Sequence, residues 1–156
     1  MNLYMRLSIA SVVMVLATCS IVNAQEKKIT REQLPPAVEK TVAEQSKGAT
    51  IKGFSTEIEN GKRLYEVALT VDGLGKDISM DKTGNIMEVE QEVSMDSLPQ
   101  AVKDGLTKAA GAGTISKVES LTKNGKLVAY EAAVKTGTKR SEIQVGPDGK
   151  KLAHPE

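Results

Sequence analysis

The side chains that most often perform catalysis are scarce in this sequence. It contains one Cys, Cys19, one His, His154, and no Trp. A nucleophile and its base need a thiolate or an imidazole held in place by neighbouring groups. His154 lies in a terminal segment that cannot hold a base in position, and no recognised motif indicates a catalytic Ser–Lys dyad. The sequence therefore predicts a protein without enzymatic activity, in which His154 is an exposed side chain.

Carboxylates are the remaining groups that could bind a metal ion or transfer protons. Asp72, Asp77 and Asp81 lie near expected turns, and residues 81–85, Asp-Lys-Thr-Gly-Asn, partly match a calcium-binding loop. The match lacks the alternating Asp or Asn ligands and the distant Glu of such a loop. Asp and Gly also favour tight turns for backbone reasons. We interpret residues 81–85 as a turn, predict no metal or cofactor site, and expect the acidic side chains to be solvated.

The overall charge is balanced, with 21 Lys and Arg against 20 Asp and Glu. Nucleic acids and anionic membrane surfaces both require clusters of basic side chains. This sequence has no long basic run. Nucleic acid is therefore not an expected partner. Membrane insertion is not expected once the N-terminal segment described next has been removed.

Residues 1–24 have the features of a secretory signal peptide. A short basic start precedes the apolar run 7–17, and small side chains at 22–24 suit signal peptidase. The apolar run is too short to span about 30 Å of hydrocarbon at about 1.5 Å per residue. We expect a periplasmic or secreted protein. Lipidation of Cys19 is less favoured, because Thr18 stands where a lipoprotein motif usually has a small residue.

The rest of the chain contains one pattern twice. Leu-Pro-Pro-Ala-Val at 34–38 returns as Leu-Pro-Gln-Ala-Val at 98–102, and Tyr-Glu-Val-Ala-Leu at 65–69 returns as Tyr-Glu-Ala-Ala-Val at 130–134. The repeated positions are apolar, turn and proline positions. We therefore predict two tandem units, residues 25–95 and 96–156. Each is so small that the two units are expected to pack together.

Each copy begins with a short amphipathic helix. In the first copy, Thr30 and Gln33 have the form of a capping box. In the second, Asp96 or Ser97 offers the cap and Pro99 suits the first turn. One apolar stripe follows helical spacing in each copy, formed by Leu34, Val38 and Val42 and by Leu98, Val102, Leu106 and Ala109.

After each helix the apolar period changes from 3.6 to 2, which indicates β-strands. A strand at 50–59 ends at Asn60-Gly61, a strong hairpin signal, and Asn124-Gly125 ends its counterpart. Tyr65 and Tyr130 fall on the apolar side of the next strands, which favours a core position over a partner contact. Further strands are predicted at 77–80, 85–93, 141–145 and 150–153. The fold class is α+β, with a short helix on an antiparallel sheet of about four strands in each unit.

These motifs resemble the PepSY-like, β-lactamase-inhibitor-like family of exported bacterial proteins. The resemblance rests on Leu-Pro-x-Ala-Val before a helix, Asn-Gly-Lys at 60–62 and 124–126, Tyr-Glu-Val or Tyr-Glu-Ala, and a final Asp-x-x-Gly or Asp-Gly hairpin. It implies a tandem of helix-on-sheet units that binds or inhibits enzymes outside the cytoplasm. The chain departs from an inhibitor in its aromatic content, since Phe54, Tyr65 and Tyr130 are the only aromatic residues after residue 24, and tight interfaces usually depend on aromatic anchors.

The residues that alternate away from the helix would line an open sheet face. We expect this face to bind a protein or peptide partner in the cell envelope, and to restrain an enzyme where the partner is one. The predicted contact residues are Leu64, Glu66, Ala68, Thr70, Ala129, Glu131, Ala133 and Lys135. One alternative is a small-molecule or cell-envelope sensor that holds its ligand between two sheets. Another is an envelope protein with a purely structural part.

Overall fold

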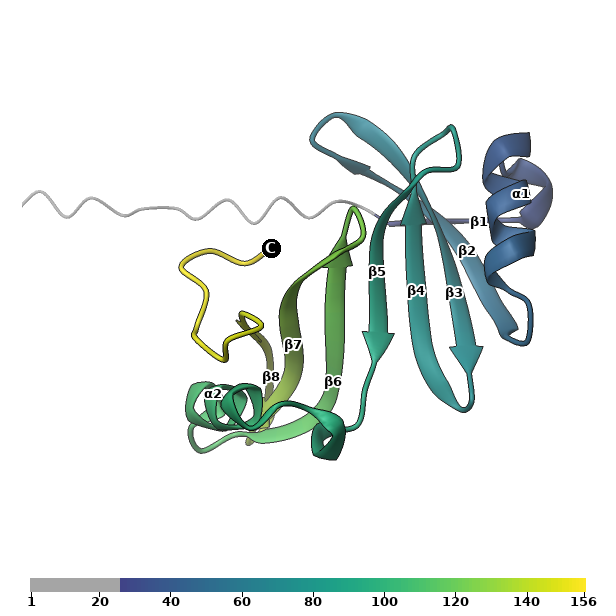
Figure 1. Cartoon of the computed structure of the whole chain (residues 1–156). Helices are drawn as coiled ribbons and strands as arrows, with labels where there is room; N and C mark the ends of the chain where they lie inside the picture. Colours follow the sequence, from purple (N-terminus) through teal and green to yellow (C-terminus); the bar gives the residue numbers. More distant parts are fainter. Residues whose placement is uncertain (1–25) are drawn as a thin grey trace, which may run out of the picture.

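The computed structural model describes residues 26–156, so the predicted signal peptide lies outside the described residues. Eight strands follow in chain order and form one antiparallel sheet with two α-helices, as the α+β prediction requires (Figure 1). The strands are β1 (Lys27–Ile29), β2 (Thr50–Glu59), β3 (Lys62–Val71), β4 (Leu74–Met80), β5 (Ile86–Glu92), β6 (Thr114–Lys123), β7 (Lys126–Thr136) and β8 (Lys139–Val145). The helices are η1 (Arg31–Gln33), α1 (Pro36–Gln45), η2 (Met95–Ser97) and α2 (Gln100–Ala110).

Proline determines where both α-helices begin. Pro35 has φ −58° and ψ 146°, and α1 starts at the next residue, Pro36. Pro99 has nearly the same angles before α2 starts at Gln100. A residue that precedes Pro is pushed out of the helical region, and Pro lacks the N–H that an interior helical residue donates. The repeated Leu-Pro motif therefore ends an extended segment and opens a helix.

The predicted capping residues serve the 3₁₀ turns, so the prediction that they cap the α-helices was wrong. The Thr30 N–H donates to Gln33 Oε1 at 2.8 Å across η1. In the second copy Ser94, rather than Asp96 or Ser97, caps η2, since its Oγ accepts from the Asp96 N–H at 3.3 Å. The proline that follows each turn prevents it from extending into the α-helix.

The two Asn-Gly hairpins were predicted correctly. Asn60 and Asn124 both have φ of 49°, and the glycines that follow have φ of 75° and 76°. Two successive positive φ angles define the tight turn whose twist matches antiparallel strands, and Asn followed by Gly adopts it most easily. The turns join β2 to β3 and β6 to β7.

Two apolar cores lie between the sheet and the helices. Val38 and Val42 of α1 and Val102 and Leu106 of α2 are fully buried. The first core consists of Leu34, Val38, Val42, Val67, Leu69, Ile78 and Met80, and the second of Leu98, Val102, Leu106, Val118, Ala132 and Val145. Tyr65 packs against the first core and Tyr130 against the second, which confirms that both rings are on the helix side of their strands.

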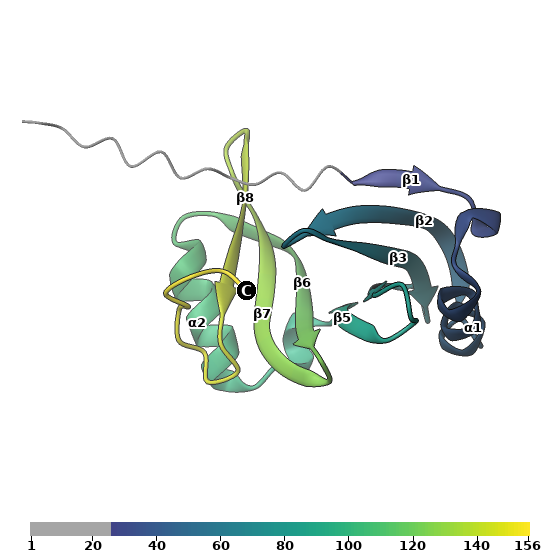
Figure 2. The same cartoon turned by 90° about the horizontal axis from the view of Figure 1, so that it is seen from above.

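The two copies share one sheet, because β5 pairs with β6 from Glu88↔Lys123 to Glu92↔Glu119. β5 lies beside β6 in the same way that β1 lies beside β2 in the first copy. The pair Lys28↔Ser55 of β1 and β2 corresponds to the pair Glu92↔Glu119 of β5 and β6. Val89 packs against the first core and Val93 against the second. These two residues are four apart in one extended segment, so α1 and α2 cover the same face of the sheet, at opposite ends of the molecule (Figure 2).

The strand predicted at 150–153 is not formed. Only Lys151 makes a single bridge, with Val145 of β8. The first copy continues from the equivalent bridge, Met80↔Ile86, into a full pairing of β4 with β5. In the second copy Pro155 occupies the position that corresponds to Glu90, and a proline cannot donate a ladder hydrogen bond. The ladder between β8 and the tail therefore stops after one residue pair.

Candidate functional site

The face of the sheet opposite the helices is the candidate site, and we call it the open face. Neither α1 nor α2 covers it, since both pack against the other face. Strand register assigns its residues, because every second side chain points to the same face. From β2 to β8 it includes Ser55, Glu57, Leu64, Glu66, Ala68, Asp77, Ser79, Glu88, Glu90, Glu92, Glu119, Leu121, Ala129, Glu131, Ala133 and Gln144.

The structure places the predicted contact residues on this face in two separate groups. Leu64, Glu66, Ala68 and Thr70 belong to β3, and Ala129, Glu131, Ala133 and Lys135 belong to β7. Leu64 and Ala129 are buried, Lys135 is exposed, and the other five are half-buried. Three strands, β4, β5 and β6, separate the two groups. The middle of the face is therefore formed by residues that were not among the predicted contacts.

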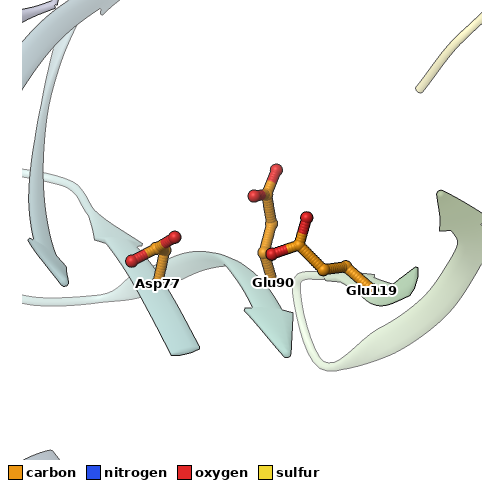
Figure 3. Close-up of side chains that lie close together, drawn as sticks. All are labelled: Asp77, Glu90 and Glu119. Carbon is orange, nitrogen blue, oxygen red and sulfur yellow. The ribbon is translucent and has the colours of Figure 1, made fainter. Parts of the chain in front are cut away.

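Three carboxylates meet at this centre, one from each middle strand. One oxygen each from Asp77 of β4, Glu90 of β5 and Glu119 of β6 lies within 4.8 Å of the others. Figure 3 shows the three side chains rising from adjacent strands on the same side of the sheet. Asp77 is directly opposite Glu90, and Glu119 is directly opposite Glu131 of β7. We call Asp77, Glu90 and Glu119 the central carboxylates.

Burial and the repulsion of neighbouring carboxylates raise the pKa of four acids of the open face, Glu66, Asp77, Glu90 and Glu131. Burial, and then the charges of Glu88, Glu119, Glu131 and Asp77, raise the pKa of Glu90 to about 8. Burial, and then Asp77, raise the pKa of Glu66 to about 7. The pKa values of Asp77 and Glu131 are also raised, in both cases mainly by burial. These are the directions expected for carboxyl groups that lose water and lie beside like charges.

Cations from the chain itself compensate the centre only in part. Lys117 Nζ lies 2.8 Å from Glu119 Oε2, and Lys123 Nζ lies 3.4 Å from Glu88 Oε2. Within residues 26–156 no side-chain hydrogen bond or ion pair reaches the Glu90 carboxylate. With a pKa of about 8, Glu90 is mostly neutral at pH 7, but the other acids of the open face still outnumber Lys117 and Lys123.

Neutral donors contact the outer acids of the face. Ser55 Oγ donates to Glu66 Oε1 at 3.2 Å, and Gln144 Nε2 donates to Glu131 Oε2 at 2.7 Å. These hydrogen bonds orient the two side chains. They add no positive charge, so the acidic character of the face remains.

The expectation that the acidic side chains are solvated was wrong for the open face. Glu119 keeps only 8% of its surface exposed, and Glu66 and Glu90 are half-buried. Sequence alternation located Glu66 and Glu131 on this face. It gave no sign of the central carboxylates, because their meeting depends on the β4–β5 and β5–β6 registers. Three carboxylates can also offer oxygen ligands to a hard cation, an arrangement that the sequence did not reveal.

Two other candidates from the sequence have simple structural roles. The Asp81 carboxylate accepts from the Thr83 and Asn85 N–H groups at 2.8 Å and 3.1 Å. Hydrogen bonds from Thr83 and Asn85 lower the pKa of Asp81 to about 2. The interpretation of residues 81–85 as a turn is therefore confirmed. His154 is exposed, as predicted.

The sensor alternative required a ligand space between two sheets. The two copies instead form a single sheet. The pockets that border the described residues lie along its surface and edges, such as one of about 210 Å³ lined by Lys28, Phe54 and Glu66. The geometry therefore does not favour a ligand held between the copies.

The fold and the open face define a class of protein, a tandem of helix-on-sheet units with one uncovered, acidic sheet face. A comparison of sequence families matches residues 20–87 and 63–150 to the β-lactamase-inhibitor-like, PepSY-like family. The two matches together span most of the chain, and the chain belongs to this family. No relative was found among curated protein sequences.

Solved structures of similar fold come from Bacteroides species. A BLIP-like protein from Bacteroides fragilis is 23% identical, with 74% of this chain and 81% of that chain covered and a TM-score of 0.55. A proposed periplasmic protein from Bacteroides eggerthii is 14% identical, with 76% and 86% covered and a TM-score of 0.63. A DUF2874 family protein from Bacteroides ovatus is 16% identical, with 76% and 84% covered and a TM-score of 0.60. At these identities the likeness supports the fold alone.

The described part of the chain has no membrane-spanning helix. Within residues 26–156, neither α1 nor α2 combines the length and the apolar content needed to cross a bilayer.

Proposed function

We propose that this protein is an exported binding module, without catalysis of its own, that holds a protein or peptide partner on its open face. The observation that supports this function is the row of half-buried carboxylates across β3 to β7, which repel one another and lack enough neighbouring cations. Like charges placed this close destabilise the free protein. A cationic segment of a partner would relieve the repulsion, so the face suits Lys or Arg side chains.

The character of the open face also limits how it binds. Among residues 26–156 it has no aromatic side chain, because Phe54, Tyr65 and Tyr130 all pack against the cores on the helix side. Affinity would then depend on charge complementarity, which mainly accelerates association and weakens with salt. The description of the family as β-lactamase-inhibitor-like supports an enzyme of the cell envelope as the partner, restrained while it is bound.

The test compares retention of envelope proteins by the exported protein and by a triple variant, E66Q/E90Q/E131Q. Gln keeps the shape of Glu but cannot ionise opposite a cationic partner, so the variant should fold and should lose most of the retained partner. The matched control, E32Q/E44Q/D104N, removes three exposed charges away from the open face and should retain the partner normally. Equal retention by both variants would contradict the proposal.

A further inference from the structure

The outer edge of β8 is an incomplete position in the sheet. In the first copy the equivalent strand, β4, pairs with β5 through five residue pairs, from Lys76↔Gln91 to Met80↔Ile86. In the second copy the corresponding pairing stops at the single bridge Val145↔Lys151. Within the described residues 26–156, β8 has β7 as its one strand partner. Its outer backbone groups are thus available to a further strand.

An apolar side chain at this edge lacks the cover that its counterpart has. Ile78 of β4 is fully buried, and its cross-strand partner is Val89 of β5. Ile143 of β8 occupies the same position in the second copy but is only half-buried, although it packs against the second core. The residue that corresponds to Val89 is His154, which is exposed in the tail. An apolar residue beside Ile143 would complete this side.

A pocket of about 480 Å³ lies where the missing strand would run. Ala109 of α2, Ile143 of β8 and Leu152 of the tail form its apolar lining, and Glu131 and Glu142 give it an acidic side. The tail at 152–156 lies beside β8 and α2 (Figure 2). Its contacts with β8 include the Lys151 bridge and a hydrogen bond of 2.8 Å from the Glu156 N–H to Gln144 Oε1.

We propose that the outer edge of β8 accepts an extended segment of a partner protein as a ninth strand, with alternating apolar and cationic side chains. The register of β4 and β5 defines the requirement. An apolar side chain would cover Ile143 on the helix side, as Val89 covers Ile78. On the open face, one of the cationic side chains flanking it would lie opposite Glu142 and the other opposite Gln144, which is hydrogen-bonded to Glu131 of β7. Backbone pairing would supply affinity, and the alternation would supply specificity.

This inference concerns the sheet edge and does not depend on the proposed function of the open face. The probe is a heptapeptide with the sequence of β5, Ile-Met-Glu-Val-Glu-Gln-Glu, carrying E88K and E90K. The unmodified β5 peptide is the matched control, with the same apolar side chains and the opposite charge. Binding to the protein purified after export is measured by calorimetry. The lysine peptide should bind at least about tenfold more tightly, which corresponds to about 1.4 kcal/mol, because opposite charges across paired strands attract and like charges repel.

Two further measurements identify the mode of binding. E142K, a change at an exposed residue, should reverse the preference between the two peptides, whereas E44Q, at an exposed residue of α1, should leave it unchanged. Two lysine peptides, N-methylated on alternate sets of residues, should differ in affinity. Methylation of the N–H groups that pair with β8 abolishes binding, and methylation of the N–H groups on the other edge does not. Equal binding of the two methylated peptides, or an unchanged preference in E142K, would overturn the proposal. A concentration-dependent dimer in sedimentation that excludes the peptide would also overturn it, because a second copy would then cover the edge.

Discussion

Replacing Glu90 by Gln should stabilise the protein at neutral and alkaline pH. In the unfolded chain this carboxyl ionises near the ordinary value of 4.5, and in the folded protein its pKa is about 8. The folded state therefore binds more protons than the unfolded state between these two values. Stability falls as pH rises through this range, and below about pH 4.5 the penalty disappears.

The size of the penalty follows from the shift. Each pKa unit corresponds to about 1.4 kcal/mol, so ionisation of Glu90 could cost at most about 5 kcal/mol. The side chain is half-buried rather than fully enclosed, and water and nearby Lys117 reduce the repulsion from Asp77, Glu88, Glu119 and Glu131. We expect E90Q to gain about 2–3 kcal/mol at pH 8 after this discount and almost nothing at pH 4.

Urea unfolding followed by far-ultraviolet circular dichroism at several pH values from 4 to 8 would measure the effect. E44Q, at an exposed residue of α1, is the control for the exchange of Glu for Gln and should change stability by less than about 0.5 kcal/mol at every pH. A gain in E90Q that is the same at pH 4 and pH 8 would refute the electrostatic explanation, as would no gain at pH 8.

Three other predictions concern stability. G149A should destabilise the protein by about 2–3 kcal/mol more than G125A: both glycines have positive φ, but the new Cβ at position 149 would meet the Ala101 carbonyl, whereas position 125 faces open space. Urea unfolding compares the two variants. D81A should lower the unfolding free energy at pH 7 by about 1 kcal/mol. The stabilisation by Asp81 is present above the ordinary Asp pKa and is lost as pH falls toward 2. The unfolding free energies of the wild type and the variant should therefore become equal near pH 2. Because β5 pairs with β6, removal of residues 96–156 should lower the melting temperature of the remaining unit, and two independent transitions in the intact chain would argue against this coupling.

The sequence predicted the features that depend on neighbouring residues. The Asn-Gly turns need two positive φ angles in succession, and the alternation around Tyr65 needs only a strand with one apolar side. Both are local properties, so both were predicted correctly. The start of α1 was predicted wrongly at Thr30 for a similar reason, because a capping box is a local signal that also suits a 3₁₀ turn. The steric effect of Pro35 and Pro36 ends that turn and makes α1 begin at Pro36.

The central carboxylates could not be predicted in this way. Asp77, Glu90 and Glu119 approach one another only because β5 pairs on one side with β4 and on the other with β6. A shift of either register by one residue would turn Glu90 to the helix side. The sequence indicates that strands exist at these positions, but the pairing of β5 with β6 joins two copies that the repeat pattern suggests are separate sheets.

The repeat also explains why the acidic centre occurs once in a duplicated fold. Glu66 and Asp77 have acidic counterparts in Glu131 and Glu142, so part of the acidic face is duplicated. Glu90 corresponds to Pro155 and Glu119 to Ser55. β5 pairs with β4 of its own copy and with β6 of the other copy, and it therefore brings the acids of both copies together. A module that binds through this centre needs both copies, because neither copy alone contains the whole site.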